Sequence, residues 1–524
     1  MKLFPMKNKD LQATQELSDN KLNAYRIFFA VLSGVLLFLS FPKFGLGVVA
    51  WFALVPLFIA LKDVESVWRS LLLGWIAGMT GCVGILYWIT HVVVNFGHLP
   101  LYLGIFLMLL LAFYLSFYTA LFAAGIVCLK KWVPLYLSAP VLWMCLEYVK
   151  SKAFTGFPWE NLGYSQFNNL FLIQIADVIG VFGLSFLIVL LNTTFYSFMT
   201  GKFKKSFALA SVVFLLWAGI YFYGIGRIAQ INELLKDVQG MEVSLVQGNI
   251  NQSIKWNRNY QQETINIYEE LSLSRPPDAG GLIVWPETAV PFHYQDDTDL
   301  QRRVKDIPVK TQNWFVFGST SYRDRGGTTD YYNSAFLLSH LGDIRGRYDK
   351  VHLVPYGEYV PMRTVFPFVG KLAEGIGDFG EGKGFYPLEM GKRKIGVMIC
   401  YEGILPEAAR MYKNADAELL VNITNDAWFG KTSAPYQHLS MTIFRAVETR
   451  LYLVRAANTG ISAIVHPTGK IIAKTGIFHK DIIHGRIKYI QLPTIYAKFG
   501  DWPVGAGFLC LAVFFLWGFV RRGR

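Results

Sequence analysis

Eight stretches of predominantly apolar residues recur along this chain, and each is long enough to cross a bilayer as a helix. The hydrocarbon core of a bilayer requires about 20 helical residues. Backbone groups in lipid must bond within their own segment, so we expect helices here and not open strands. The expected spans are 24–41, 44–61, 69–90, 101–129, 133–149, 169–197, 206–225 and 501–520.

The overall composition agrees with a membrane-embedded chain. Of 524 residues, 53% are hydrophobic and only 17% are charged, which is more apolar than an ordinary soluble protein of this length. The formal net charge of +13 would favour nucleic acid only if the basic residues formed a patch on a soluble domain. Many of them cluster instead at the ends of the apolar stretches, so we expect no nucleic-acid partner.

The basic residues also predict the orientation, because loops that stay in the cytoplasm are enriched in Lys and Arg. With eight spans, the basic groups within 2–26, 62–69, 130–131, 202–205 and 521–524 fall on one side, which is then the cytoplasm; Lys150 and Lys152 are exceptions. We expect a cytoplasmic extension at 1–23 and a membrane domain of seven spans at 24–225, whose first span is an uncleaved signal anchor. An exported domain at 226–500 precedes the eighth span and basic tail at 501–524.

Few ionisable residues lie within the expected spans, and the notable ones are Glu147 and Asp177. An intramembrane acid can mark a path for ions. A structural or interfacial role is the alternative. We favour it because only two such residues occur and one of them lies near the end of a span.

From about residue 240 the pattern changes to short β-rich stretches that alternate with longer polar, helical ones. Several strands are apolar almost throughout, as expected when both faces of a sheet are covered. Strands interleaved with helices predict an α/β sandwich. The expected strands are 242–247, 281–285, 314–318, 334–339, 395–400, 419–423, 453–456 and 462–466, and the expected helices are 261–273, 405–413 and 437–450.

Cys400 is the only cysteine outside the expected spans and therefore has no disulfide partner in the exported domain. Two interpretations are open. Cys400 is either a small apolar residue that ends the strand 395–400, or a nucleophile displayed at the end of that strand, where catalytic groups collect in α/β folds. The other cysteines are Cys82, Cys128, Cys145 and Cys510.

Glu287 and Lys350 allow two interpretations each. Glu287, in Trp-Pro-Glu-Thr after a strand, is either a capping carboxylate or a general base whose pKa is raised by apolar surroundings. Lys350 is either a solvated cation paired with Asp349 or an ammonium that stabilises a thiolate and an oxyanion. Taken singly, the structural interpretation of each residue is the simpler one.

Taken together, these residues resemble the nitrilase, or carbon–nitrogen hydrolase, superfamily. The order is Trp-Pro-Glu at 285–287, Asp-Lys-Val-His-Leu-Val-Pro-Tyr-Gly-Glu-Tyr-Val-Pro at 349–361 and Ile-Cys-Tyr-Glu at 399–402. Seven spans before such a domain and one after it resemble a single branch, the apolipoprotein N-acyltransferases of bacterial envelopes. Thr-Gly-Phe-Pro-Trp at 155–159, Asn-Asp-Ala-Trp-Phe-Gly at 425–430 and Gln-His at 437–438 fit this branch too.

The resemblance implies a nitrilase-like αββα sandwich and a two-step acyl transfer. Cys400, deprotonated by Glu287, would attack the sn-1 ester of a phospholipid, typically phosphatidylethanolamine, and form a thioester. The α-amine of the diacylglyceryl-cysteine that begins an apolipoprotein would then take the acyl chain. Lys350 and the backbone N–H of Tyr401 would hold the oxyanion. The resemblance further implies supporting acids, Glu358 and Glu402, and pocket residues, Trp256, Tyr401 and Trp428.

A thioester keeps enough acyl-transfer potential for an amine to displace it, so we expect neither a cofactor nor a metal ion. The resemblance implies a bacterial inner-membrane protein whose catalytic domain faces the periplasm, and we expect a monomer. The stretch 366–384, rich in Gly and Phe, is interpreted either as a mobile arm that touches the membrane or as a long surface loop.

Two other functions are alternatives. A membrane-anchored amidase or nitrilase would use the same three residues on a small C–N substrate, although one anchor would suffice for it. A transporter or scaffold with a degenerate enzyme domain is disfavoured by the intact Glu, Lys and Cys and by the scarcity of charges within the spans. No HExxH, CxxC, Walker or GxSxG motif indicates any other chemistry.

Overall fold

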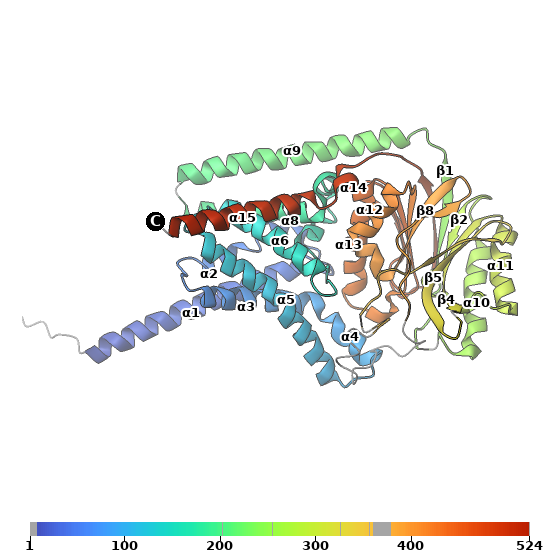
Figure 1. Ribbon diagram of the computed structural model, residues 1–524, viewed down its shortest axis with the longest axis horizontal. Helices are drawn as coiled ribbons and strands as arrows, with labels where there is room; N and C mark the ends of the chain where they lie inside the picture. The colour runs from blue at the N-terminus through green and yellow to red at the C-terminus, as the bar shows by residue number, and fades with distance from the viewer. Residues whose placement is uncertain are drawn as a thin grey trace, which may run out of the picture.

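A bundle of long helices and an α/β unit lie end to end in this protein (Figure 1). The computed structural model describes residues 8–201, 203–253, 255–324, 326–355, 357–359 and 379–522, without the side chains of 8–22 and 522. Most of the stretch 366–384, the expected arm, lies outside the described residues. The helical half comes from residues 8–235 and 502–522, and the α/β unit from 240–499.

The long helices of the helical half pack mainly on their neighbours in the sequence. They are α1 (Asn8–Leu39), α3 (Val67–Leu86), α5 (Leu101–Leu129), α6 (Leu135–Lys152), α8 (Ala176–Thr200), α9 (Phe203–Leu235) and α15 (Trp502–Arg522). Short elements connect them: η1 (Gly47–Trp51), α2 (Val55–Ala60), α4 (Trp88–Asn95), η2 (Leu162–Gln166) and α7 (Leu170–Ile173). α3 packs against both α1 and α5, while α6 packs against α8 and α15.

Five of these helices, namely α3, α5, α8, α9 and α15, are long and apolar enough to cross a membrane. The expectation of eight such helices is therefore not met by the described part of the chain. The stretch 44–61 is divided into η1 and α2, which are each too short to cross. α6, at the expected span 133–149, carries Glu147, Lys150 and Lys152 among its 18 residues, and the apolar helical part of α1 covers only 23–39.

Other spans differ from expectation in their continuity. The stretch 69–90 is divided between α3 and α4, and the stretch 169–197 between α7 and α8. Within α8, Gly180 has a φ of 62°, and a Cβ there would lie 2.3 Å from the Tyr496 ring, so the local backbone requires glycine. α9 runs to Leu235, past the expected boundary at 225, and leads directly into the first strand.

Two sheets pack face to face in the α/β unit and form the expected αββα sandwich (Figure 1). The first has the order β13-β1-β2-β4-β5-β6, with β3 paired to β4, and the second has the order β12-β11-β10-β9-β8-β7. The strands are β1 (Gly240–Gln247), β2 (Leu282–Val284), β3 (Val290–His293), β4 (Trp314–Asp324), β5 (Thr329–Leu338), β6 (Ile344–Asp349), β7 (Leu388–Met390), β8 (Arg393–Ile399), β9 (Leu419–Thr424), β10 (Tyr452–Ala457), β11 (Ala463–Val465), β12 (Ile471–Lys474) and β13 (Asp481–Lys488).

Helices cover the outer faces of both sheets. α10 (Arg258–Ser274) and α11 (Asp299–Thr311) lie on the first sheet, and α12 (Pro406–Asn414) and α13 (Ala434–Thr449) lie on the second (Figure 1). Short helices η3 (Cys400–Ile404) and η4 (Asp426–Phe429) follow β8 and β9, and α14 (Ile495–Phe499) precedes α15. All eight expected strands are present, and the expected helices correspond to α10, α12 and α13.

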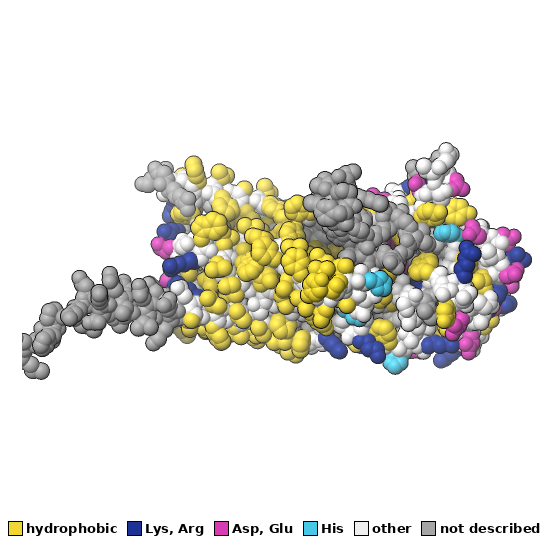
Figure 2. Space-filling view, turned by 90° about the horizontal axis from the view of Figure 1, so that it is seen from below, with side chains coloured by type: hydrophobic (Ala, Val, Ile, Leu, Met, Phe, Trp, Pro, Cys, Tyr) yellow, Lys and Arg dark blue, Asp and Glu magenta, His cyan; other side chains and the backbone are white. Residues whose placement is uncertain are grey.

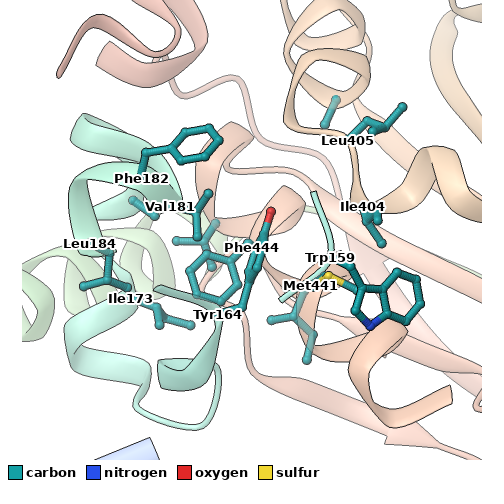
Figure 3. Packing of buried hydrophobic residues seen from close by; sticks show 14 of the residues in the cluster. Trp159, Tyr164, Ile173, Val181, Phe182, Leu184, Ile404, Leu405, Met441 and Phe444 are labelled. Atoms are coloured by element: carbon teal, nitrogen blue, oxygen red, sulfur yellow. The ribbon is translucent and has the colours of Figure 1, made fainter. Parts of the chain in front are cut away.

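α13 lies between the second sheet and the helical half, and the two halves share a buried apolar layer there. Phe444 of α13 meets Tyr164 of η2 edge to face at 5.0 Å, with Ile173, Val181 and Leu184 of the helical half nearby (Figure 3). On the surface, apolar side chains cover the helical half in a broad band, and charged side chains gather at the two ends of the molecule (Figure 2). This distribution suits a helical half immersed in lipid.

Gly74 on α3 lies against the backbone of α5, so an added methyl group should force the two helices apart. A Cβ at Gly74 would lie 2.6 Å from the Thr119 carbonyl oxygen and 2.9 Å from the Ala120 Cα. Because these are backbone atoms, we expect Gly74→Ala to destabilise the protein by about 1–3 kcal/mol. Thermal unfolding in detergent micelles measures this. Gly219→Ala on α9, where a Cβ meets nothing within 4 Å, is the control, and equal melting temperatures for the two variants would contradict the packing.

Candidate active site

Cys400 lies at a sharp turn between β8 and η3. Its φ of 54° is a left-handed conformation that is uncommon for a residue with a side chain. The Cys400 carbonyl oxygen accepts a hydrogen bond from Asn422 Nδ2 at 3.2 Å and lies 3.3 Å from His438 Nε2. Cys400 stays partly exposed, whereas its neighbours Ile399 and Glu402 are fully buried. The turn therefore displays a thiol at the end of the strand.

Lys350 follows β6 and is almost completely buried, at 1% exposure. Its Nζ donates to Glu358 Oε1 at 2.9 Å, lies 2.8 Å from Glu358 Oε2, and is 3.8 Å from Glu287 Oε1. Burial alone lowers the pKa of Lys350, but the Glu358 and Glu287 carboxylates together raise it well above its usual value. Lys350 is therefore a fixed ammonium at neutral pH.

Glu287 follows β2 through Trp285 and Pro286, and hydrogen bonds hold both of its carboxylate oxygens. Oε1 accepts from Asn333 Nδ2 at 2.8 Å, and Oε2 accepts from the Asn425 backbone N–H at 2.8 Å. Asn333 Nδ2 also donates to Glu358 Oε1 at 2.9 Å, so one amide group links the two carboxylates that surround Lys350. Asn333 has no motif around it in the sequence, and sequence analysis did not identify it.

The Cys400 thiol is protonated in this arrangement. Burial raises its pKa, the negative charge of Glu287 raises it further, and the positive charge of Lys350 lowers it by less. A thiol of this kind attacks an ester efficiently only when a base takes its proton as it reacts, whereas iodoacetamide reacts with the small fraction that is already thiolate. The structure brings Glu287, Lys350 and Cys400 together, as the resemblance implies, and their catalytic roles stay predictions.

Glu402 is fully buried and holds two chain segments together. Its Oε1 accepts from the Tyr348 hydroxyl and from the backbone N–H groups of Val351 and His352, at 2.9, 2.7 and 3.0 Å. Its Oε2 accepts from the Ile399 N–H at 2.7 Å. Glu402 thus ties the segment after Lys350 to the strand that ends at Cys400. Burial raises the pKa of Glu402 to about 7.

The expected pocket residues differ in their surroundings. The Tyr401 ring is stacked between His352, at a centroid distance of 5.6 Å, and Trp159, at 6.3 Å. Trp428 contacts Phe96 of the helical half at 4.8 Å, which places it at the boundary between the two halves. Trp256 is partly exposed and follows the buried Lys255.

Lys255 is a buried cation that sequence analysis did not select as a site residue. Its Nζ donates to Thr288 Oγ1 at 2.7 Å and to the Glu287 carbonyl oxygen at 3.2 Å. Thr288 has a φ of 47°, so Lys255 supports a strained turn directly after Glu287. Burial lowers the pKa of Lys255 to about 7, and the nearby Glu287 carboxylate opposes this shift.

A cavity of about 100 Å³ lies in the helical half beside Trp159. Apolar side chains of α1, α3 and α5 form much of its lining, and Glu160 is part of its polar side. Trp159 lines this cavity and also stacks on Tyr401, the residue after Cys400. The cavity and Cys400 are therefore separated by few side chains. Among the described residues, no group of three or more acidic, His or Cys side chains is arranged to hold a metal ion.

The charges around Cys400 predict opposite effects of two substitutions on its alkylation by iodoacetamide. Because Glu287 raises the pKa of the thiol, Glu287→Gln should lower this pKa and speed alkylation at pH 7. Because Lys350 lowers the pKa, Lys350→Met should slow alkylation. We expect changes of about threefold to tenfold, since thiolate population follows pKa. Peptide mass spectrometry measures the rates against wild type, and changes in the same direction would contradict the arrangement of charges.

Residues 33–194 match the family described as apolipoprotein N-acyltransferase N-terminal domain, and residues 242–493 match the carbon–nitrogen hydrolase family. An apolipoprotein N-acyltransferase from Geobacter metallireducens is 44% identical over 91% of this chain and 93% of its own length. Another from Methylococcus capsulatus is 32% identical over the same shares. The solved structure of Saccharomyces cerevisiae Nit3, of the nitrilase superfamily, matches 48% of this chain and 90% of its own, with 20% identity and a TM-score of 0.38. The chain belongs to the apolipoprotein N-acyltransferase family.

Proposed function

We propose that this enzyme transfers an acyl chain from a phospholipid to the N-terminal cysteine of apolipoproteins, through a thioester on Cys400. The observation that carries the proposal is a buried ammonium, Lys350, held between two carboxylates beside a thiol. A nucleophile, a base and a fixed positive charge are the groups that acyl transfer requires. The site lies where the α/β unit meets apolar helices, which a hydrolase of small soluble substrates would not need.

In the first step, Glu287 takes the proton of the Cys400 thiol as the sulfur attacks the carbonyl carbon of the sn-1 ester. Negative charge develops on the ester carbonyl oxygen, and Lys350 and the Tyr401 backbone N–H stabilise it. The carbon–oxygen bond to the glycerol then breaks. Glu287 returns the proton to the leaving oxygen, so a lysophospholipid departs and Cys400 keeps the acyl chain as a thioester.

In the second step, the α-amine of the diacylglyceryl-modified cysteine attacks the thioester. Glu287 takes a proton from the amine, and the same two donors hold the oxyanion. The carbon–sulfur bond breaks, and the proton on Glu287 restores the Cys400 thiol. In the net reaction of the two steps, one ester and one amine are converted to one alcohol and one amide.

The hydrogen bonds of Glu287 support its role as the base. Asn333 and the Asn425 N–H fix both oxygens, so the carboxylate is held in one orientation before substrate arrives. The resting thiol is protonated, so the reaction requires such a base. Glu358 holds Lys350, and Glu402 holds the two segments in register, which makes both of them supporting residues.

The acyl donor reaches Cys400 from the helical half. The cavity beside Trp159 offers an apolar lining for an acyl chain, and the chain would avoid water on its way to the thiol. Trp256, Tyr401 and Trp428 would line the remainder of the pocket. The donor is a phosphatidylethanolamine-like phospholipid, and the acceptors are diacylated apolipoproteins.

The distribution of basic residues supports a location. The enzyme is a multi-pass protein of the bacterial inner membrane, with residues 226–500, which include the α/β unit, in the periplasm and both described ends on the cytoplasmic side. The five long apolar helices supply five crossings. We propose that α1, the η1–α2 segment taken as one unit, and α6 supply three more, so that a monomer crosses the membrane eight times.

The product distinguishes acyl transfer from hydrolysis. Purified enzyme is incubated with phosphatidylethanolamine labelled in the sn-1 chain and with a diacylated lipopeptide, and lipids and peptides are analysed by mass spectrometry. We expect labelled, triacylated lipopeptide and one lysophospholipid for each. Labelled free fatty acid as the main product, without triacylated lipopeptide, would contradict the proposal.

Cys400→Ala should lower formation of the triacylated product by about a thousandfold or more, because the thioester cannot form. Glu287→Gln should lower it by roughly a hundredfold or more, because it removes the base. Cys510→Ala is the matched control, since Cys510 lies in α15, and it should retain activity. Unchanged product formation by Cys400→Ala would overturn the mechanism.

A further inference from the structure

The end of α13 that lies far from the nucleophile is held by Arg450, which follows the helix with a left-handed φ of 56°. The Arg450 side chain is fully buried. It donates four hydrogen bonds, to Asp177 Oδ2 at 3.1 Å, to the Gln174 side-chain and backbone oxygens at 2.6 and 2.9 Å, and to the Pro467 carbonyl at 3.0 Å, and its Nη2 lies 2.9 Å from Asp177 Oδ2 in an ion pair. A surface residue would not require such complete pairing.

Asp177 connects Arg450 to two helices of the helical half. It is 1% exposed, near the start of α8. Tyr223 Oη donates to its Oδ1 at 2.7 Å, and Arg227 Nε donates to its Oδ2 at 2.7 Å, both from α9. The "Arg450 cluster", meaning Arg450, Asp177, Gln174, Tyr223 and Arg227, therefore joins α7, α8 and α9 to the end of α13. Asp177 therefore makes an interfacial contact, which is the role favoured over an ion path in the sequence analysis.

The other end of α13 contacts both the helical half and the nucleophile turn. Gln437 Oε1 accepts from Trp159 Nε1 at 2.8 Å, and Gln437 Nε2 donates to the Pro42 carbonyl at 3.0 Å. The next residue, His438, lies 3.3 Å from the Cys400 carbonyl and 3.0 Å from Asp426. One helix thus carries contacts to Cys400 near its start and the Arg450 cluster just past its end.

α13 cannot shift without disturbing its whole surroundings. Every side chain from Gln437 to Thr449 is buried, between the second sheet and the helical half (Figure 3). Protein interiors are close-packed, so a displacement at one end of a buried helix is transmitted to the other end. The position of the Arg450 cluster therefore sets where His438 and Cys400 lie relative to the helices that contact lipid.

We propose that Arg450 and Asp177 are positioning residues, which hold Cys400 in line with an acyl donor that arrives from the membrane. This inference rests on the proposed function. Asp177 and Arg450 belong to opposite halves, and their bond fixes the angle at which the sandwich stands on the helices. A donor that enters from water does not depend on this angle, whereas a phospholipid anchored in the bilayer does.

The experiment compares two acyl donors with Arg450→Lys, which keeps the charge but supplies too few donors in the wrong geometry. One donor is phosphatidylethanolamine in nanodiscs, and the other is a soluble short-chain acyl thioester. Rates of Cys400 acylation are measured by intact mass spectrometry and divided by the fraction of Cys400 that iodoacetamide titrates. We expect the rate from phosphatidylethanolamine to fall roughly tenfold or more, with the rate from the soluble donor within about twofold of wild type.

Tyr223→Phe is a milder variant, which removes one hydrogen bond to Asp177 and keeps the buried ion pair. It should show the same selective loss to a smaller extent, and it keeps the test valid if Arg450→Lys does not fold. Arg302→Lys, on α11, is the matched control. Arg302 forms an exposed ion pair with Asp297, and its substitution should change neither rate.

Equal losses with both donors would overturn the inference, because they indicate a general structural role. No loss with either donor would also overturn it, because the contact would then have no effect on acylation. Failure of the wild-type enzyme to acylate Cys400 from phosphatidylethanolamine would instead overturn the proposed function on which the inference rests. Failure of the inference is therefore seen in the variants, and failure of the proposed function is seen in the wild-type enzyme.

Discussion

The buried ammonium of Lys350 is the constraint on which the rest of the site depends. A cation removed from water is costly unless anions and hydrogen bonds surround it. Glu358 supplies both of its oxygens, and Glu287 lies 3.8 Å away. Burial raises the pKa of the Cys400 thiol, the Glu287 carboxylate raises it further, and Lys350 lowers it by less, so the thiol stays protonated. Glu358 is the nearer partner of the cation, and Glu287, the proposed base, lies farther from it.

This balance of charges holds only while separate chain segments stay in register. Lys350 follows a strand of the first sheet, whereas Cys400 follows a strand of the second. Glu402 accepts hydrogen bonds from both segments, and Asn333 bridges the carboxylates of Glu287 and Glu358. The proposed acylation of Cys400 by a lipid adds a further requirement, because the sandwich must also stand at a fixed position on the helices. α13 contacts both the second sheet and the helical half, and we infer that it meets this requirement.

The residues that lie in motifs, and the strands that are apolar throughout, could be predicted from the sequence. Cys400, Glu287 and Lys350 follow strands in recognisable contexts, and the structure does bring them together. Asn333 and Lys255 were not selected, because an amide in a strand and a lysine in a loop are ordinary until their partners are known. β6 was missed as well, since it is an edge strand with two arginines and a half-exposed pattern.

The membrane spans show a different limit of sequence analysis. Apolar composition indicates burial, but it does not distinguish lipid from protein as the surroundings. α2 is apolar because other helices cover it: five of its six residues are buried, and Leu57 and Ala60 are fully buried. α6 carries charged residues near its end because Lys150 and Glu147 contact the loop before η2. Tertiary contacts therefore explain why these segments differ from uninterrupted spans.

The central claim is that Cys400 itself carries the acyl chain between the two substrates. The most direct measurement incubates the enzyme with phosphatidylethanolamine alone, maps its peptides by mass spectrometry, and then adds diacylated lipopeptide. The account predicts one hydroxylamine-sensitive acyl group, on the peptide that contains Cys400, which the lipopeptide discharges much faster than water does. An acyl group on another residue, or triacylated product formed without any acyl-enzyme, would contradict it.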